Sequence, residues 1–195
     1  MSSTLIPLPA NHEDWIQTLW LAQVVGKFTL NERDYKTYWP LVDGFWSHRK
    51  TENHLHGKFK THYYACQLGP KRVSSKAEPY PTETKSGKKH VTSCSLPGTC
   101  PVKIKIIEPI QFGTDDQKLW TISQVLGCND TGFKFHDHDI NASWKAKRSS
   151  FLTNIIKDEL AKGYTPSQVK DRLRGVGRVA GYERLESIGG AFMKR

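Results

Sequence analysis

The chain has 195 residues, a length that fits one domain or two small ones. Its 37% hydrophobic, 25% charged and 11% aromatic residues exclude a disordered chain, and no apolar run is long enough to cross a membrane. The formal net charge of +10 indicates either a polyanionic partner or a well-solvated surface.

The N-terminal part is near neutral in charge and has a helical pattern. A first helix is predicted from Asn11, which can cap it, to Val25, with Gly26 ending it. A second, short helix is predicted from the Asn31 cap to about Tyr38, because Pro40 disfavours helix at the residue before it. The apolar stripe of the first helix consists of Trp15, Leu19, Ala22 and Val25.

The middle of the chain alternates short β patterns with turns. A polar, Lys-rich stretch over 69–99 has the composition of an inserted loop. The middle of the chain and its C-terminal part carry most of the positive charge, so we expect an acidic partner to bind there. Strands are predicted over 45–50, 59–67, 102–107 and 119–126. The third of these has one solvent-exposed, basic face.

The helical pattern returns after Trp144. Ser149 or Ser150 can cap a helix over 151–162, and Thr165 followed by Pro166 starts another that reaches about Leu173. A weaker helical pattern covers 182–188.

The two stronger helices and their Gly-Tyr turn resemble a helix-turn-helix, in which Lys170, Arg172 and Arg174 would favour DNA. A pair of helices that only packs against the rest of the protein is the competing interpretation.

The chemistry of the chain is concentrated in its thiols and one histidine pair. No signal peptide opens the sequence, so we expect a reducing, intracellular location where thiols bind metal or stay free. His136 and His138 are two apart, which on a strand places both imidazoles on one face. Two thiols would complete a tetrahedral zinc set. The candidates are Cys66, Cys94, Cys100 and Cys128.

Four short motifs then follow in a characteristic order. They are Asp43-Gly44-Phe45, Thr61-His62-Tyr63-Tyr64-Ala65-Cys66, Thr99-Cys100-Pro101-Val102-Lys103 and His136-Asp137-His138. This order resembles the WRKY–GCM zinc-finger superfamily, both plant WRKY domains and the variant in Mutator-like transposases and their far-red-response relatives. The C-x-x-G strand end of the latter is matched by Cys66-Gln67-Leu68-Gly69, and its tryptophan-bearing strand by Trp120. The resemblance covers about half of the chain.

The resemblance implies one structural zinc ion held by Cys66, Cys100, His136 and His138. A rival set replaces Cys66 with Cys94, which has a shorter spacing to Cys100, and Cys128 is then a free thiol. The long insertion between the two cysteines departs from the family, but the cost of loop closure grows slowly with length. The alternative to any zinc site is that these thiols and imidazoles are unrelated.

In the family the first strand of the sheet enters the major groove of DNA by its edge. The WRKYGQK signature is absent here, so no target sequence can be carried over. At the matching positions, Arg49 or Lys50 can donate to guanine and Asn53 can pair with adenine. The resemblance therefore implies a DNA-contacting set of His48, Arg49, Lys50 and Asn53, with Lys58, Lys60 and Tyr63 as phosphate contacts. A merely solvated basic strand is the competing interpretation.

Together these features predict an α+β protein with three parts: an N-terminal helical segment (1–40), a WRKY–GCM-like zinc-binding β domain with an insertion at 67–99 (41–140), and a C-terminal helical segment (141–195). We expect a nuclear, non-enzymatic protein that binds double-stranded DNA sequence-specifically and regulates transcription. We expect the protein to bind neither a membrane nor a small-molecule substrate, although the terminal helices could bind other proteins. The DNA-binding part of a Mutator-like transposase or a domesticated derivative, and a zinc-stapled protein-interaction module, are the alternatives. A zinc hydrolase is disfavoured because four protein ligands leave no open position.

Overall fold

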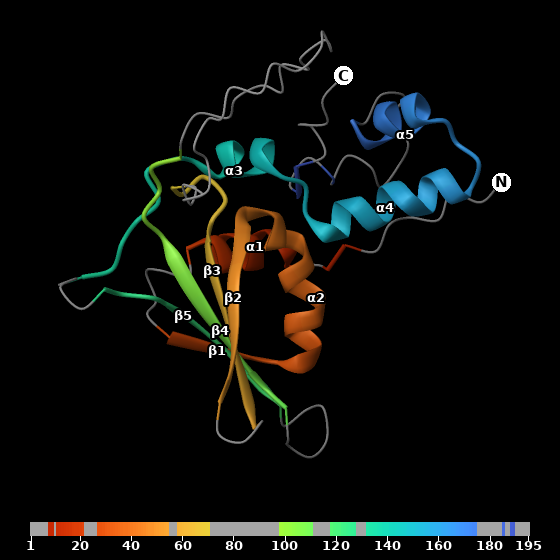
Figure 1. The fold of residues 1–195 in the computed structure, drawn as a ribbon. Helices are drawn as coiled ribbons and strands as arrows, with labels where there is room; N and C mark the ends of the chain where they lie inside the picture. Colours follow the sequence, from red (N-terminus) through yellow and green to blue (C-terminus); the bar gives the residue numbers. More distant parts are fainter. Residues whose placement is uncertain are drawn as a thin grey trace, which may run out of the picture.

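A computed structural model gives the fold of residues 8–9, 11–21, 27–54, 58–70, 98–110, 118–127, 132–174, 185 and 188–189. The protein is α+β, as predicted, with an antiparallel sheet and flanking helices (Figure 1). Its elements are α1 (His12–Trp20), β1 (Lys27–Asn31), α2 (Glu32–Val42), the 3-10 turn η1 (Asp43–Phe45), β2 (Trp46–His54), β3 (Phe59–Cys66), β4 (Lys103–Pro109), β5 (Leu119–Gln124), α3 (Ile140–Ala146), α4 (Ser150–Ala161) and α5 (Pro166–Leu173).

The sheet has five strands in the order β1-β5-β4-β3-β2, and every neighbouring pair is antiparallel. The four predicted strands are all present, and β2 runs on to His54, beyond its predicted end. The strand β1 was not predicted. Its residues alternate exposed Lys27 and Thr29 with half-buried Phe28 and buried Leu30, over only five residues, and the strand pairs with β5, which is far away in the sequence. The N-terminal segment therefore contributes an edge of the sheet.

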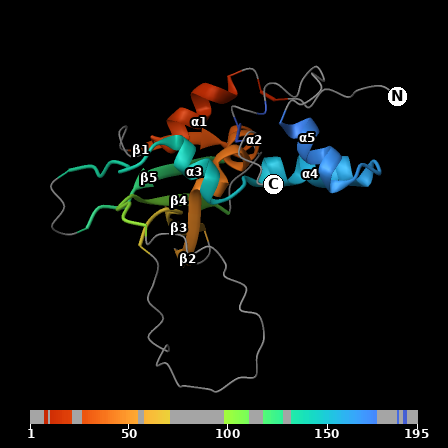
Figure 2. The same cartoon turned by 90° about the horizontal axis from the view of Figure 1, so that it is seen from above.

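The helices α1 and α2 cover one face of the sheet, and Figures 1 and 2 show both on the same side. Aromatic side chains of α2 lie against the sheet: Tyr35 stacks on Trp120 at 3.8 Å, and Trp39 meets Tyr64 edge-on. From the strands, the core receives the fully buried side chains of Trp46, Ile104, Ile106 and Ile122. The other face of the sheet carries Lys27, Thr29 and Lys103, all exposed.

Two predictions for the N-terminal helices were wrong. The helix α1 ends at Trp20, not at Val25, which lies outside the described residues. The helix α2 continues through Pro40 to Val42. An interior proline costs about 3 kcal/mol. Burial of Trp39, Leu41 and Val42, the last two with no exposed surface, contributes about 1.5–3 kcal/mol each and outweighs that cost.

The C-terminal helices begin and end close to where the sequence predicts. Ser149 caps α4 through the Leu152 N–H, and Thr165 forms a capping box with Gln168 at the start of α5. The short helix α3 precedes the predicted return to helix and is capped by Asp139. Most of the predicted helix over 182–188 lies outside the described residues. Within the described part of the chain, no helix is both long enough and apolar enough to cross a membrane.

The Asp43-Gly44-Phe45 motif joins the sheet to α4. A Cβ on Gly44 would lie 2.8 Å from backbone atoms of Arg148 and Ser149, so only glycine allows η1 to approach this closely. The Asp43 carboxylate accepts a 2.7 Å hydrogen bond from the Ser150 N–H, at the first turn of α4. The predicted motif thus has a packing role here.

We expect Asp43→Ala to lower the free energy of unfolding by about 0.5–2 kcal/mol, because it removes a cap from α4. Asp171→Ala, at an exposed position of α5, is the control and should change stability little. Urea unfolding of both variants measures the difference. Equal stability of the Asp43 variant and the wild type would show that Ser149 alone suffices to cap the helix.

Candidate functional site

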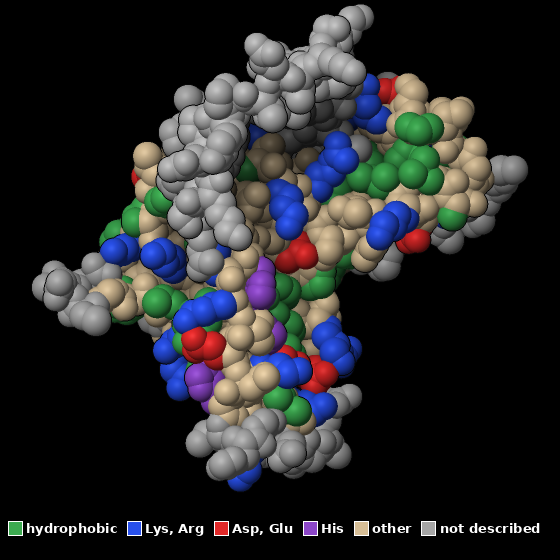
Figure 3. Space-filling view, viewed as in Figure 1, with side chains coloured by type: hydrophobic (Ala, Val, Ile, Leu, Met, Phe, Trp, Pro, Cys, Tyr) green, Lys and Arg blue, Asp and Glu red, His purple; other side chains and the backbone are tan. Residues whose placement is uncertain are grey.

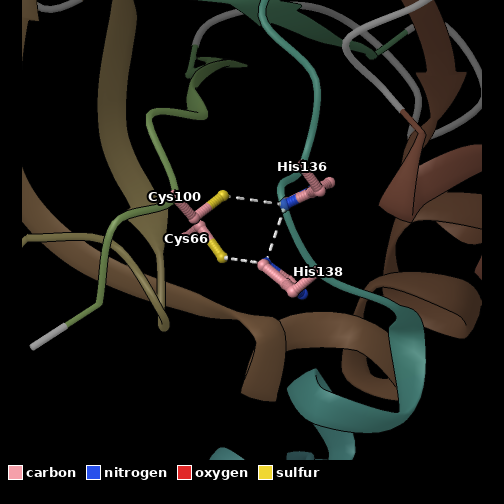
Figure 4. Close-up of side chains that lie close together, drawn as sticks. All are labelled: Cys66, Cys100, His136 and His138. Atoms are coloured by element: carbon pink, nitrogen blue, oxygen red, sulfur yellow. Dashed lines mark hydrogen bonds between the residues drawn. The ribbon is translucent and has the colours of Figure 1, made fainter. Parts of the chain in front are cut away.

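Four side chains that are far apart in the sequence meet above one end of the sheet (Figure 4). The ligand atoms of Cys66, Cys100, His136 and His138 all lie within 4.8 Å of one another. Sγ of Cys100 is 3.1 Å from Nδ1 of His136, and Sγ of Cys66 is 3.2 Å from Nε2 of His138. Ligands about 2.0–2.3 Å from a tetrahedral ion lie roughly 3.3–3.8 Å from one another, so the cluster has the dimensions of such a site.

The two cysteines come from neighbouring strands. Cys66 ends β3, and Cys100 precedes β4; the Cys66 N–H donates to the Val102 carbonyl, and the Cys100 N–H donates to the Leu68 carbonyl. The turn that follows Cys66 needs Gly69, because a Cβ there would lie 2.9 Å from the Cys66 carbonyl oxygen and 3.0 Å from that of Cys100. The C-x-x-G motif therefore serves to bring the two thiols together.

The histidine pair does not lie on a strand, contrary to the prediction. Residues 133–136 have no regular secondary structure. The amide of Gln124 instead replaces a strand partner: it donates to the Lys134 carbonyl at 2.7 Å and accepts from the Lys134 N–H at 2.8 Å. A side chain at the end of β5 thus holds the segment that carries both imidazoles.

The hydrogen bonds of the two imidazoles fix their tautomers. Nε2 of His136 lies 3.2 Å from the Trp20 carbonyl oxygen, and Nδ1 of His138 lies 2.9 Å from that of Asp139. A carbonyl oxygen only accepts, so these two nitrogens carry the protons. In the neutral rings, the nitrogens that face the cluster are then lone-pair donors, which is the form that binds a metal.

The N-terminal helix also shields the cluster. The Trp20 indole stacks on the His136 ring at 5.0 Å with an angle of 4° between their planes, and Trp46 approaches the same ring from β2 at 5.7 Å. Aromatic rings around a metal-binding imidazole restrict its rotation and limit access of water. Nothing in the sequence pattern of α1 indicated this role for Trp20.

The Cys66 and Cys100 thiols are both free and buried. A hydrogen bond from Cys66 lowers the pKa of Cys100, with His136 acting in the same direction, whereas the same hydrogen bond and burial raise the pKa of Cys66. Two buried thiolates side by side repel each other unless a cation lies between them. A thiolate–imidazole set is therefore suited to a bound dication.

The cluster as a whole is compatible with one structural metal ion held by these four side chains. Four protein donors complete a tetrahedron and leave no position for water or substrate. The rival ligand Cys94 and the predicted free thiol Cys128 lie outside the described residues.

The residues predicted to contact DNA lie on β2 and β3 or just before β3, but the two strands divide them between the two faces of the sheet. Lys50 and Tyr63 are opposite each other on the face away from α1 and α2, with the Lys50 ammonium 4.5 Å from the centre of the Tyr63 ring. Register places His48 opposite Tyr64, and Asn53 opposite Lys60, on the face that α2 covers. Lys58 is exposed in the turn before β3.

Arg49 occupies a special position on β2. The register shifts between His48 and Lys50, so Arg49 has no partner on β3 and forms a β-bulge on an edge strand. Bulges re-aim side chains at sheet edges. Its guanidinium lies 3.4 Å from the Pro70 carbonyl oxygen and borders a hollow of about 380 Å³, which Tyr63, Cys100 and Lys103 also line.

A chain of polar side chains on the covered face was missed by sequence reasoning. The Thr51 hydroxyl lies 2.9 Å from His48 and 3.0 Å from His62, and His62 lies 2.9 Å from a Glu108 carboxylate oxygen. His48 and Thr51 share β2, but His62 and Glu108 come from β3 and β4, so spacing in the sequence does not show that the four meet. The chain fixes the His48 ring beside Arg49.

The cations of the helix pair α4–α5 are partly engaged within the protein. Arg172 lies over the Tyr164 ring at 4.1 Å, and its Nε is 3.4 Å from the buried carboxylate of Glu159. Lys162 pairs with the same carboxylate at 2.6 Å. These contacts favour the packing interpretation of the pair over the helix-turn-helix one.

Comparisons of this chain with protein-family models, with curated proteins and with solved structures found no match.

Proposed function

We propose that the four-residue cluster binds one zinc ion and that the zinc-stabilised sheet binds double-stranded DNA sequence-specifically, as a regulator of transcription in the nucleus. Zinc suits this donor set because it accepts thiolate and imidazole together in tetrahedral geometry and has no redox chemistry of its own. The ion would connect the ends of β3 and β4 with the segment that follows β5. A WRKY–GCM-like arrangement of the sheet is part of the proposal.

The observation that carries the DNA proposal is the position of Arg49. It lies on a bulge of an edge strand, in a basic chain, directly beside the metal-anchored end of the sheet. The major groove is wide enough for a two-stranded β-ribbon, and arginine is the most common reader of guanine there. The division of the neighbouring residues between two faces suits entry by the edge, since each face would then meet one wall of the groove.

Selection of bound duplexes from a random library tests the function, with metal content measured on the same sample. We expect enrichment of a defined sequence by protein that carries one zinc ion per chain, and loss of that enrichment in strong chelator. Binding of duplexes without any sequence preference would favour the backbone contacts of a transposase-type module. The absence of DNA binding, together with a bound acidic protein, would favour the interaction module.

We predict that Arg49→Ala weakens binding to the selected duplex by about 1–3 kcal/mol and relaxes the preference at one base position. Lys60→Ala is the matched comparison: it should weaken binding to all duplexes alike, because phosphate contacts carry no sequence information. Anisotropy titrations with selected and scrambled duplexes measure both effects. Unchanged affinity and preference in the Arg49 variant would show that β2 does not read the bases.

A further inference from the structure

We infer that the face of the sheet that none of the described helices covers, beyond the edge strand, binds the sugar-phosphate backbone of duplex DNA. This inference rests on the proposed function and extends it to residues that the DNA-contacting set does not include. Its basis is a row of side chains that crosses the whole sheet. The open-face row consists of Lys50, Tyr63, Lys105, Ser123 and Lys27, each directly opposite the next on a neighbouring strand.

The row places one lysine on every second strand. Lys27, Lys105 and Lys50 lie on the first, third and fifth strands in the order β1-β5-β4-β3-β2. Strands lie about 4.8 Å apart, so these lysines recur at about 9.5 Å and together cover roughly 19 Å. A lysine ammonium on a flexible four-carbon stem can adjust to a phosphate near its own strand. If only the edge strand β2 contacted DNA, Lys50 would be the one lysine of this row to do so.

The charges around the row favour an anion. Lys103 lies beside it, opposite Ala65 on β3. Within the described residues, Lys27, Lys103 and Lys105 form no ion pair. The strand residues on this face include one acid, Glu52, which accepts a hydrogen bond from Lys50. Figure 3 shows Lys and Arg side chains gathered on the flank of the sheet to the left of β2, away from α2.

The hollow beside Arg49 connects this face with the edge. The described residues that line it include Arg49, Lys50 and Lys103 with Tyr63, Tyr64 and Val125, and none of these described residues is a carboxylate. Cations from β2 and β4 thus converge on one concave site, which suits the oxygens of a phosphate. A backbone that contacts this hollow can continue over Lys105 towards Lys27. This geometry accounts for the lysines far from β2.

The test compares two doubly substituted, zinc-loaded full-length proteins of equal charge. Lys103→Gln/Lys105→Gln removes two cations from the open face, and Lys147→Gln/Lys157→Gln removes two exposed cations elsewhere. The probe is a labelled DNA duplex of mixed sequence, titrated at several salt concentrations. We expect the slope of log Kd against log salt to fall by about 1.8 in the open-face variant, at about 0.9 per phosphate contact, and to stay unchanged in the control.

Each result has a separate meaning. Wild-type protein that binds no duplex would refute the proposed function and this inference with it. Wild-type binding with equal slopes in the two variants would refute the inference alone and leave the edge strand as the contact surface. The inference also fails if the open-face variant loses binding to vesicles rich in phosphatidylserine or to an acidic peptide while its DNA titration is unaltered. Equal metal content and melting temperature exclude misfolding as the cause.

Discussion

Cys66→Ser should yield a protein without stoichiometric metal and without a cooperative unfolding transition. The Cys66 thiol is fully buried, at the junction of β3, the turn to Cys100 and the His138 ring. Apparent zinc-binding free energies in zinc-finger peptides are about 10–16 kcal/mol, and whole domains are stable by about 5–15 kcal/mol. Loss of one ligand therefore removes a binding free energy as large as the total free energy of unfolding of a domain. Metal analysis and circular dichroism on heating measure the two outcomes.

Cys94→Ser is the matched control for this experiment, because Cys94 is the rival ligand from the sequence. We expect it to keep one metal ion per chain and the wild-type melting temperature. A reversal of the two results, with metal lost from the Cys94 variant and kept in the Cys66 variant, would replace the ligand set. Retention of folded structure by the wild type in strong chelator would contradict a structural role for the metal altogether.

The predictable parts of this structure are those set by short-range patterns. Caps such as Asn31, Ser149 and Thr165 act within four residues, and β4 alternates Lys103 and Lys105 with buried Ile104 and Ile106, so both could be inferred from sequence. The cluster of Cys66, Cys100, His136 and His138 was inferred from motif order, and the structure brings these four residues together.

The parts that could not be predicted depend on long-range contacts. The strand β1 forms only against β5, and the histidine segment is held by the Gln124 amide, not by strand pairing. Pro40 stays helical because burial of its apolar neighbours in the core contributes more free energy than an interior proline costs. The Trp20 stack on His136 joins residues 116 apart, and the open-face row arises only from the register of five strands. Sequence spacing carries no information about such contacts.

Phe45→Ala should lower the free energy of unfolding by about 3–5 kcal/mol, the usual cost of removing a buried phenylalanine ring. Phe45 has no exposed surface, and its ring meets Trp144 of α3 edge-on at 4.3 Å. Its carbonyl also accepts a 2.7 Å hydrogen bond from the Gln67 N–H, directly after Cys66. For a chain of this size the melting temperature should fall by roughly 6–20 °C. Thermal and urea unfolding measure the change.

Phe133→Ala is the control, because it removes the same ring from a site that is 45% exposed, and it should alter stability by less than about 0.5 kcal/mol. The Phe45 variant should still hold one metal ion per chain, since no ligand is changed, and should unfold in one step. That single step follows from the contacts of Phe45 and of the Asp43 cap, which tie the sheet to α3 and α4. Two separate transitions, with helical signal lost first, would instead make residues 141–195 a domain that folds independently of the metal-centred sheet.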